Sequence, residues 1–221
     1  MADQSDHLLR EIDEDLRNER MEKLWKKYGG AVIGLAVLIV VVVAGYQGWQ
    51  AYDRNARAES AETFVQAQGL ARAGDREAAR NLLSTLGASG AGGYPLLAKF
   101  REATLHLEQN NPSAARSTYD AIIQDGSVDG LYQDLARVLS AMVELDQSSP
   151  DLASVESILA PVLPIENAWS PAARELMALV ALARGERNAA RDGYQQLADD
   201  PTTPPGLRSR ANEMLTVLDQ D

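Results

Sequence analysis

Cysteine is absent from this chain of 221 residues. Without cysteine the fold contains no disulfide, and the chain has no thiol redox chemistry. Zinc sites and iron–sulfur clusters that depend on cysteine ligands are excluded for the same reason. Whatever lies outside a membrane must therefore be stabilised by its own packed core.

Histidine is almost as rare, and no catalytic motif accompanies the two that exist. His7 lies near the start of the chain, whereas His106 follows Glu102 by four residues, a spacing that places two metal ligands on one helix face. Because no second histidine lies on that face, we interpret His106 as a packed or surface residue. The glycine-rich segment 87–93 lacks the Gly-Lys-Ser/Thr ending of a phosphate-binding loop, so we interpret it as a loop between helices. We expect no enzymatic activity, no metal and no cofactor.

Positive charge is also scarce, since 21 Lys and Arg residues stand against 32 Asp and Glu residues and give a net charge of −11. From residue 53 onward the chain contains 15 basic and 24 acidic residues, a net charge of −9. Contacts to nucleic-acid phosphates require concentrated positive charge, so we expect no nucleic-acid partner. This charge favours a soluble domain after residue 52.

One long segment, residues 28–52, contains no charge at all. As a helix, its 25 residues would extend about 37 Å at about 1.5 Å per residue, which exceeds a hydrocarbon layer of about 30 Å. Valines 40–43 would favour a strand in water, but in lipid only a helix satisfies its own backbone. Aromatic residues typical of membrane interfaces flank the segment: Trp25 and Tyr28 at one end, and Tyr46, Trp49 and Tyr52 at the other. The sequence therefore predicts a single transmembrane helix in the lipid bilayer.

The charges that flank this segment predict its orientation. Five basic residues lie within about 15 residues before it, and two lie within the same distance after it. The basic side stays in the cytoplasm, so we predict a cytoplasmic amphipathic tail (1–27), a signal anchor (28–52) and an exported domain (53–221). The alternative is a cleaved signal peptide, because residues 56–58 (Ala-Arg-Ala) resemble a cleavage site. We favour the uncleaved anchor, since this triplet lies some ten residues beyond the apolar run and that run is unusually long for a signal peptide.

Gly30 and Gly34 lie four residues apart within the predicted anchor. Such a pair lets two membrane helices approach closely, which predicts packing against a second helix or a homodimer. The alternative is that these residues have no special role, because glycine is common in membrane helices.

The rest of the chain is repetitive and has helical periodicity without an alternating strand pattern. Three times a polar turn is followed by Ala-Ala-Arg, at residues 78–80, 114–116 and 189–191. Four residues after the second alanine stands a large apolar residue, and three residues further stands another. These pairs are Leu83 and Leu86, Tyr119 and Ile122, and Tyr194 and Leu197. A weaker copy at Val155, Leu159 and Val162 gives spacings of 36, 40 and 35 residues, which are typical of stacked helical repeats.

Pairs of a capping residue and proline predict where helices start, because proline at a first helical position lacks only an N–H that would be unpaired. These pairs are Asn111-Pro112, Ser149-Pro150, Ser170-Pro171 and Thr203-Pro204. After the last of them, a terminal amphipathic helix is predicted by Leu207, Ala211, Leu215 and Leu218.

The repeated pattern resembles the second helix of a tetratricopeptide repeat. The first helices carry that family's small residue at Ala67, Ala103 and Ala178, whereas its tryptophan is replaced by Thr63, Lys99 and Arg174. The resemblance implies an all-α fold, in which the anchor is followed by a helical-repeat α-solenoid of about four degenerate helix pairs and a C-terminal capping helix. It also implies a concave protein-binding groove along the first helices. The candidate groove residues, for each of which an ordinary core position is the alternative, are Phe64, Phe100, Leu107, Leu179 and Leu182.

A short cytoplasmic tail, one anchor and an exported degenerate repeat array together resemble the YfgM-like family of bacterial inner-membrane proteins. The resemblance implies a non-enzymatic scaffold that is ancillary to the SecYEG translocon and has a periplasmic repeat domain. Its implied partners are Sec translocon subunits, a membrane-tethered periplasmic chaperone and exported polypeptides. The alternative is a structural organiser of a cell-envelope complex, such as the division or cell-wall machinery.

Overall fold

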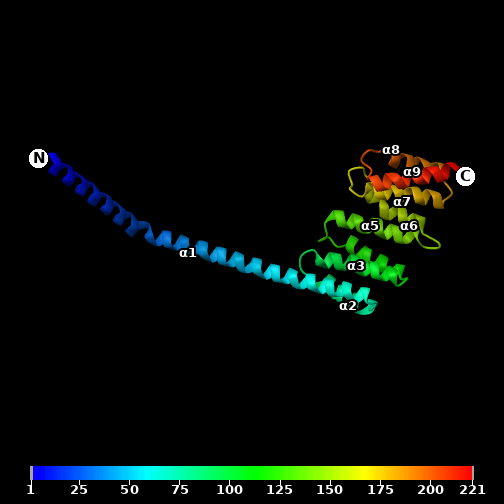
Figure 1. Ribbon diagram of the computed structural model, residues 1–221, viewed down its shortest axis with the longest axis horizontal. Coiled ribbons are helices and arrows are strands. Elements are labelled where there is room, and N and C mark those ends of the chain that lie inside the picture. Colours follow the sequence, from blue (N-terminus) through cyan, green and yellow to red (C-terminus); the bar gives the residue numbers. More distant parts are fainter. Residues whose placement is uncertain (1, 221) are drawn as a thin grey trace. The chain divides into compact units, whose positions relative to one another are not determined.

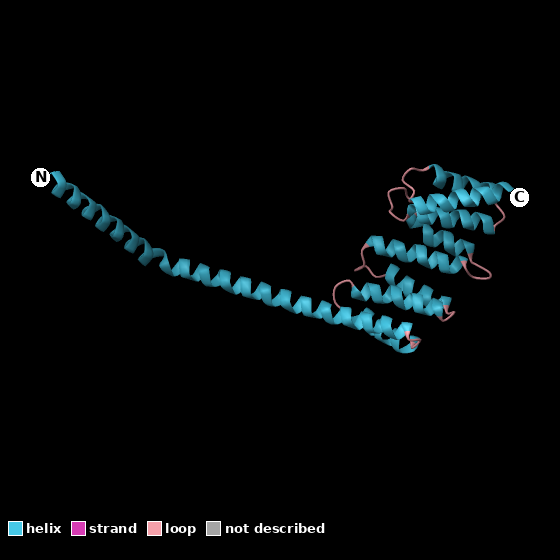
Figure 2. Cartoon of the chain, in the orientation of Figure 1, coloured by secondary structure: helices cyan, strands magenta, loops and turns pink. Residues whose placement is uncertain are grey.

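The computed structural model describes residues 2–220, with side chains at Met21 and from Trp25 onward except at residues 31 and 32. All regular structure in this part of the chain is helical, and it contains no strand (Figure 2). The predicted all-α fold is therefore confirmed. The predicted amphipathic face of the tail lies outside the described side chains. Two compact units make up the chain, one up to Ala56 and one from Arg57 onward.

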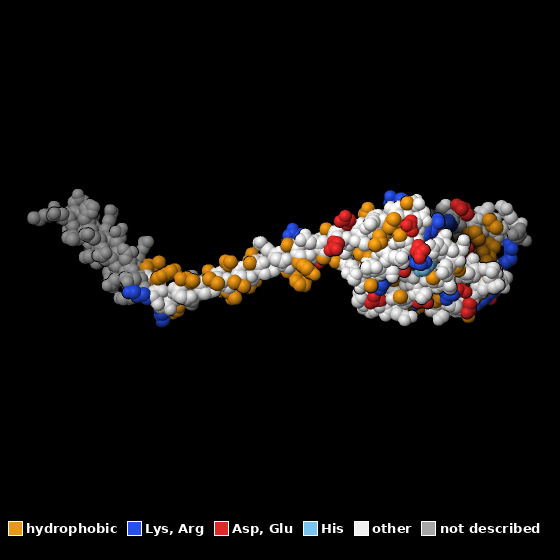
Figure 3. All heavy atoms as spheres, turned by 90° about the horizontal axis from the view of Figure 1, so that it is seen from below, with side chains coloured by type: hydrophobic (Ala, Val, Ile, Leu, Met, Phe, Trp, Pro, Cys, Tyr) orange, Lys and Arg blue, Asp and Glu red, His pale blue; other side chains and the backbone are white. Residues whose placement is uncertain are grey.

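Helix α1 (Ala2–Arg72) contains the predicted membrane segment. Among the described residues, one stretch, within Trp25–Arg72, is long and apolar enough to cross a membrane. Its side chains are almost all exposed, as Val40 is by 66%, and Figure 3 shows apolar side chains along its surface. Side chains this apolar and this exposed suit a helix that is surrounded by lipid.

The same helix continues past residue 52 and supplies the first helix of the repeat region. Residues 53–68 contain neither glycine nor proline and are rich in alanine and glutamate, which favours an unbroken helix. Gly74, with φ at +89°, follows the end of α1 in a left-handed conformation that glycine adopts without strain.

From Arg57 onward, four helix pairs and a final helix follow one another. The first pair is the end of α1 with α2 (Arg76–Ser89), and the second is α3 (Tyr94–Glu108) with α4 (Pro112–Ile123). The remaining elements are α5 (Gly130–Leu145) with α6 (Leu152–Leu159) and the 3₁₀ helix η1 (Ala160–Val162), α7 (Ser170–Ala183) with α8 (Arg187–Asp199), and α9 (Pro205–Gln220). Figure 1 shows the helix pairs stacked in the order of the chain, with α9 beside α7 and α8, and each helix packs mainly on its neighbours along the chain. The predicted number of helix pairs and the capping helix are confirmed.

Side-chain caps begin three of the second helices. Asp75, Asn111 and Asp151 each accept a hydrogen bond from the N–H three residues later, at 3.1, 3.2 and 3.1 Å. Such a cap satisfies one of the N–H groups that a helix start leaves without a partner. The predicted start at Asn111-Pro112 is therefore confirmed.

The other predicted starts differ from the structure. The one at Ser149-Pro150 is wrong by two residues, because the following aspartate supplies the cap and α6 begins at Leu152. The remaining two are wrong by one residue: α7 begins at Ser170, and α9 begins at Pro205. Proline marks the neighbourhood of each start. In α6 the Asp151 side chain, which accepts a hydrogen bond from the Ser154 N–H, decides the first residue, whereas α7 begins without a side-chain cap.

The repeat positions predicted from the sequence form the core of this unit. The small residues of the first helices and the large apolar residues of the second helices are all at most 4% exposed. They are Ala67, Leu83, Leu86, Ala103, Tyr119, Ile122, Val155, Leu159, Val162, Ala178, Tyr194 and Leu197. They belong to four clusters, each of which joins one pair to its neighbour. Since alanine allows close approach of two helices and the large residues fill the space beside it, the predicted register is confirmed.

One polar contact recurs between successive pairs. In each second helix the residue that follows Ala79, Ala115, Val155 or Ala190 reaches the end of the next first helix or of α9. This residue is arginine in three helices and glutamate in α6, where its partner is the arginine. The contacts, with partners 28 or 29 residues apart, are Arg80 with Gln109, Arg116 with Glu144, Glu156 with Arg184, and Arg191 with Asp219. Because Glu156 would meet a carboxylate if it faced Glu144 or Asp219, this exchange favours the native order of the repeats.

Candidate protein-binding surface

The first helices share one pattern of buried residues. Small or apolar residues recur at the same offsets in three helices: Ala98, Ala103 and Leu105 in α3, Ala136, Ala141 and Val143 in α5, and Ala173, Ala178 and Val180 in α7. Ala141 therefore holds the position of Ala103 and Ala178. Sequence reasoning missed it, although the offsets alone would have found it, because the turn between α5 and α6 is longer than the corresponding turns.

This pattern leaves apolar side chains exposed on the other side of the first helices. Met142 and Leu179 directly follow the small residues of α5 and α7, and they are 49% and 37% exposed. Leu97, six residues before Ala103, is 49% exposed. The sequence analysis did not select Leu97 or Met142. Their spacing from Ala103 and Ala141 would have placed them on the exposed face of the first helices. Met142 and Leu179 hold matching positions, and exposed apolar residues on stacked helices are typical of a protein-binding surface.

Three of the five predicted groove residues contribute to core clusters while staying half-buried. The ring centroids of Phe64 and Tyr94 lie 6.1 Å apart, and those of Phe100 and Tyr119 lie 6.2 Å apart. Leu182 packs against the cluster that joins α7, α8 and α9. These three side chains belong to three different clusters, so they do not share one pocket.

The other two predicted residues, Leu107 and Leu179, are exposed, and Leu107 lines a cavity of about 550 Å³. This cavity lies where α3 and α5 end. Its lining consists of Leu107, Asn110, Pro112, Met142, Val143, Asp146 and Gln147. The structure thus brings Leu107 together with Met142, which sequence reasoning did not select.

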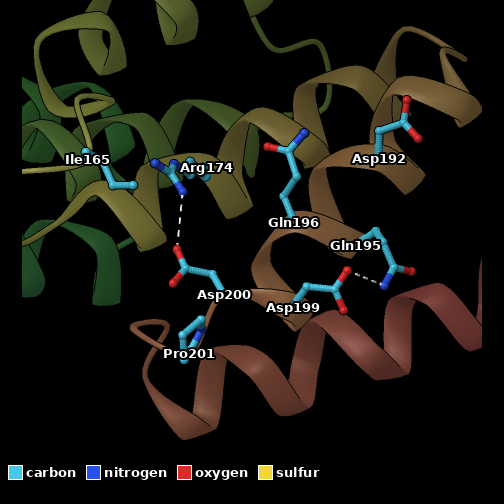
Figure 4. A pocket seen from close by; sticks show the side chains of 8 residues that line it. All are labelled: Ile165, Arg174, Asp192, Gln195, Gln196, Asp199, Asp200 and Pro201. Carbon is cyan, nitrogen blue, oxygen red and sulfur yellow. Dashed lines mark hydrogen bonds and ion pairs between the residues drawn. The ribbon is translucent and has the colours of Figure 1, made fainter.

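A larger hollow of about 830 Å³ lies beside the C-terminal half of α8, and most of the residues that line it are polar (Figure 4). Arg174 forms an ion pair of 3.6 Å with Asp200, and the side-chain amide of Gln195 donates a hydrogen bond of 2.9 Å to Asp199. A hydrogen bond from the Thr202 hydroxyl is the main cause that lowers the pKa of Asp200. Asp199 and Asp200 thus bind other residues of the chain, and these contacts stabilise the end of α8.

His106 is a half-buried residue of α3. Its pKa is lowered, chiefly by burial and in addition by the nearby charge of Arg80. Burial is also the main cause that raises the pKa of Glu102. Both shifts favour the neutral forms of these side chains, as expected for packed positions. The residues that the structure describes contain no cluster of three or more metal-ligating side chains.

Comparison with models of protein families matches residues 22–207 to the tetratricopeptide repeat-like domain. The chain belongs to the tetratricopeptide repeat-like family. The match begins before the apolar helix and ends within α9, so this tetratricopeptide repeat-like region includes the apolar helix and all four helix pairs. Domains of this kind are typically non-enzymatic scaffolds that mediate protein–protein interaction. Neither the curated proteins nor the solved structures that were compared gave a match.

Proposed function

We propose that this protein is a membrane-anchored scaffold that binds other proteins. One observation carries the proposal: a single family match runs across both the apolar helix and the repeats. The repeats bury one another's small and large residues, yet Leu97, Met142 and Leu179 stay exposed on the first helices. Exposed apolar side chains on stacked first helices support binding of a partner segment.

The proposed location is the bacterial inner membrane, with residues 1–27 in the cytoplasm and the repeats in the periplasm. The charge difference across the apolar segment supports this orientation, since basic residues precede it in excess. A phosphatase that is active only in the periplasm, fused after Asp221, should be active. Protease added to spheroplasts should degrade the repeats, whereas an inactive fusion with protected repeats would reverse the orientation.

The proposed partners are Sec translocon subunits, a membrane-tethered periplasmic chaperone and exported polypeptides, as the resemblance to the YfgM-like family implies. An anchor would make weak contacts sufficient, because tethering two partners to one membrane raises their effective concentration to about the millimolar range. Two partners that share a bilayer therefore need only a modest interface.

Purification in a mild detergent, followed by mass spectrometry, tests the choice of partner. We expect translocon subunits or a membrane-tethered chaperone with the full chain and much less of either with residues 57–221 alone. Recovery of division or cell-wall proteins instead would favour a structural organiser of the envelope. Equal recovery by the full chain and the fragment would contradict a role for the anchor.

A further inference from the structure

The cavity at the ends of α3 and α5 combines an apolar wall with negative electrostatic potential. Leu107 lies in the last turn of α3, and Met142 lies in the last turn of α5. The C-terminal end of a helix carries about half a negative charge, because its last carbonyl groups have no partner within the helix. The N-terminus of α4 contributes about half a positive charge nearby, which offsets one of these two helix ends and leaves the other. The cavity therefore favours a cation beside an apolar group.

Asp146 adds a full negative charge to the rim of this cavity. It caps α5 through its backbone, and its carboxylate forms no hydrogen bond or ion pair within the described part of the chain. The arginines of the adjoining helices are already engaged, since Arg101 pairs with Glu108 and Arg116 pairs with Glu144. No lysine or arginine is among the residues that line the cavity.

We propose that this cavity binds a partner-protein segment in which a large apolar side chain is followed by lysine or arginine. The apolar side chain lies between Leu107 and Met142, and the basic side chain pairs with Asp146. This inference rests on the proposed function, because it names the kind of segment that the scaffold would select. The net charge of −9 from residue 53 onward favours the approach of such a basic segment.

The polar groups of the rim suit a peptide backbone as well. Asn110 has φ at +54°, lies in the turn between α3 and α4, and is one of the residues that line the cavity. Gln147 also lines it, and its amide donates a hydrogen bond of 2.8 Å to the Val143 carbonyl, which leaves its side-chain oxygen as an acceptor. The side-chain amides of these two residues supply donors and an acceptor of the kind that pairs with the peptide groups of an extended segment.

The test measures fluorescence anisotropy of labelled peptides with the detergent-purified full chain. One peptide carries a central Leu-Phe-Lys-Arg sequence in a Gly/Ser background. A second carries Leu-Phe-Glu-Asp, and a third carries Ser-Ser-Lys-Arg. We expect the first to bind at least about threefold more tightly than the second, from the charge of Asp146, and at least about tenfold more tightly than the third, from the apolar side chain.

Two variants test the assignment of residues, and each has a matched control. Met142→Glu should weaken binding of the first peptide at least about tenfold, whereas Asp146→Lys should reverse the preference between the first and second peptides. The controls are Ile165→Glu and Asp192→Lys, which change an exposed apolar residue and an exposed acid at the hollow beside α8. Both controls should leave binding unchanged, and helicity by circular dichroism should be equal in all four variants.

The proposal is overturned if the three peptides bind alike, or if the controls act as strongly as the cavity variants, since binding would then follow net charge. It is also overturned if Met142→Glu dissolves a dimer of the chain, because a second copy would then occupy the cavity. If the chain shows no preference among the peptides but still captures envelope partners, the proposed cavity site is refuted and the proposed function is not. If the chain prefers the first peptide but captures no envelope partner, the proposed function is refuted and the proposed cavity site is not.

Discussion

Replacement of Arg116 by methionine should destabilise the repeat region far more than replacement of Arg184, although both arginines hold equivalent inter-repeat contacts. Glu144, the partner of Arg116, is only 6% exposed, and its second carboxylate oxygen accepts a hydrogen bond of 2.8 Å from the Asp151 N–H. Removing the arginine leaves a buried carboxylate without a counter-charge, which costs about 3–5 kcal/mol. The pair of Arg184 with Glu156 is about one-third exposed, and its loss should cost only about 0.2–1 kcal/mol.

A double variant separates the loss of the pair from the loss of packing. Arg116→Met with Glu144→Gln removes both charges and keeps an acceptor for the Asp151 N–H, so it should recover most of the stability lost in the single variant. For a domain of this length, about 3–5 kcal/mol corresponds to a fall in Tm of roughly 6–20 °C.

The assay is urea unfolding of residues 57–221, followed by circular dichroism. This fragment should fold alone, because all four core clusters lie within it. Losses below about 1 kcal/mol for both Arg116→Met and Arg184→Met would refute the reasoning, as would a double variant that is less stable than the single one.

Three further predictions follow from the same structure. Tyr194→Ala should cost about 3–5 kcal/mol, because the ring is 1% exposed, and a loss below about 0.5 kcal/mol in urea unfolding would contradict the repeat register. The Ser127 hydroxyl is the main cause that lowers the pKa of Asp125 to about 2. A lowered carboxyl pKa stabilises the fold above about pH 4, and this stabilisation is lost as pH falls through about 2. Asp125→Asn should therefore destabilise the fragment in urea unfolding at pH 6 and much less at pH 2. A Cβ added at Gly30 or Gly34 would meet no described atom within 4 Å outside its own helix turn, so Gly30→Leu and Gly34→Leu should leave the fold of the monomer unchanged. If two copies pack through this face, either variant should reduce the amount of cross-linked dimer in detergent. Unchanged cross-linking would exclude a dimer through this face.

The repeat register was predictable from the sequence because it depends on residue size at fixed offsets. Ala103 and Ala178 allow close helix packing, and Tyr119 and Tyr194 fill the adjoining space, so the same spacing recurs wherever two pairs stack. The terminal helix was predictable for the same reason. Ala211 is a small residue of α9 that packs against the last helix pair, as the small residues of the first helices do.

Other features depended on information that no single repeat contains. The third copy lacks Ala-Ala-Arg because Ser154, Val155 and Glu156 stand in its three positions, and the reason for Glu156 is visible only through its partner Arg184 in the next repeat. The cavity joins Leu107 and Met142 from two different repeats, so it follows from stacking rather than from local spacing. The start of α6 depended on which of several polar side chains reaches an unpaired N–H, which spacing does not decide.

Site-specific photo-cross-linking in living cells tests the central claim most directly, namely that an anchored repeat domain binds envelope proteins through its first helices. A cross-linker placed at Met142 should form adducts with translocon subunits, a membrane-tethered chaperone or exported polypeptides. The same group placed at Ser157, an exposed position of the second helix α6, should form few or none. Absence of protein adducts at Met142, or equal adducts at both positions, would contradict the account.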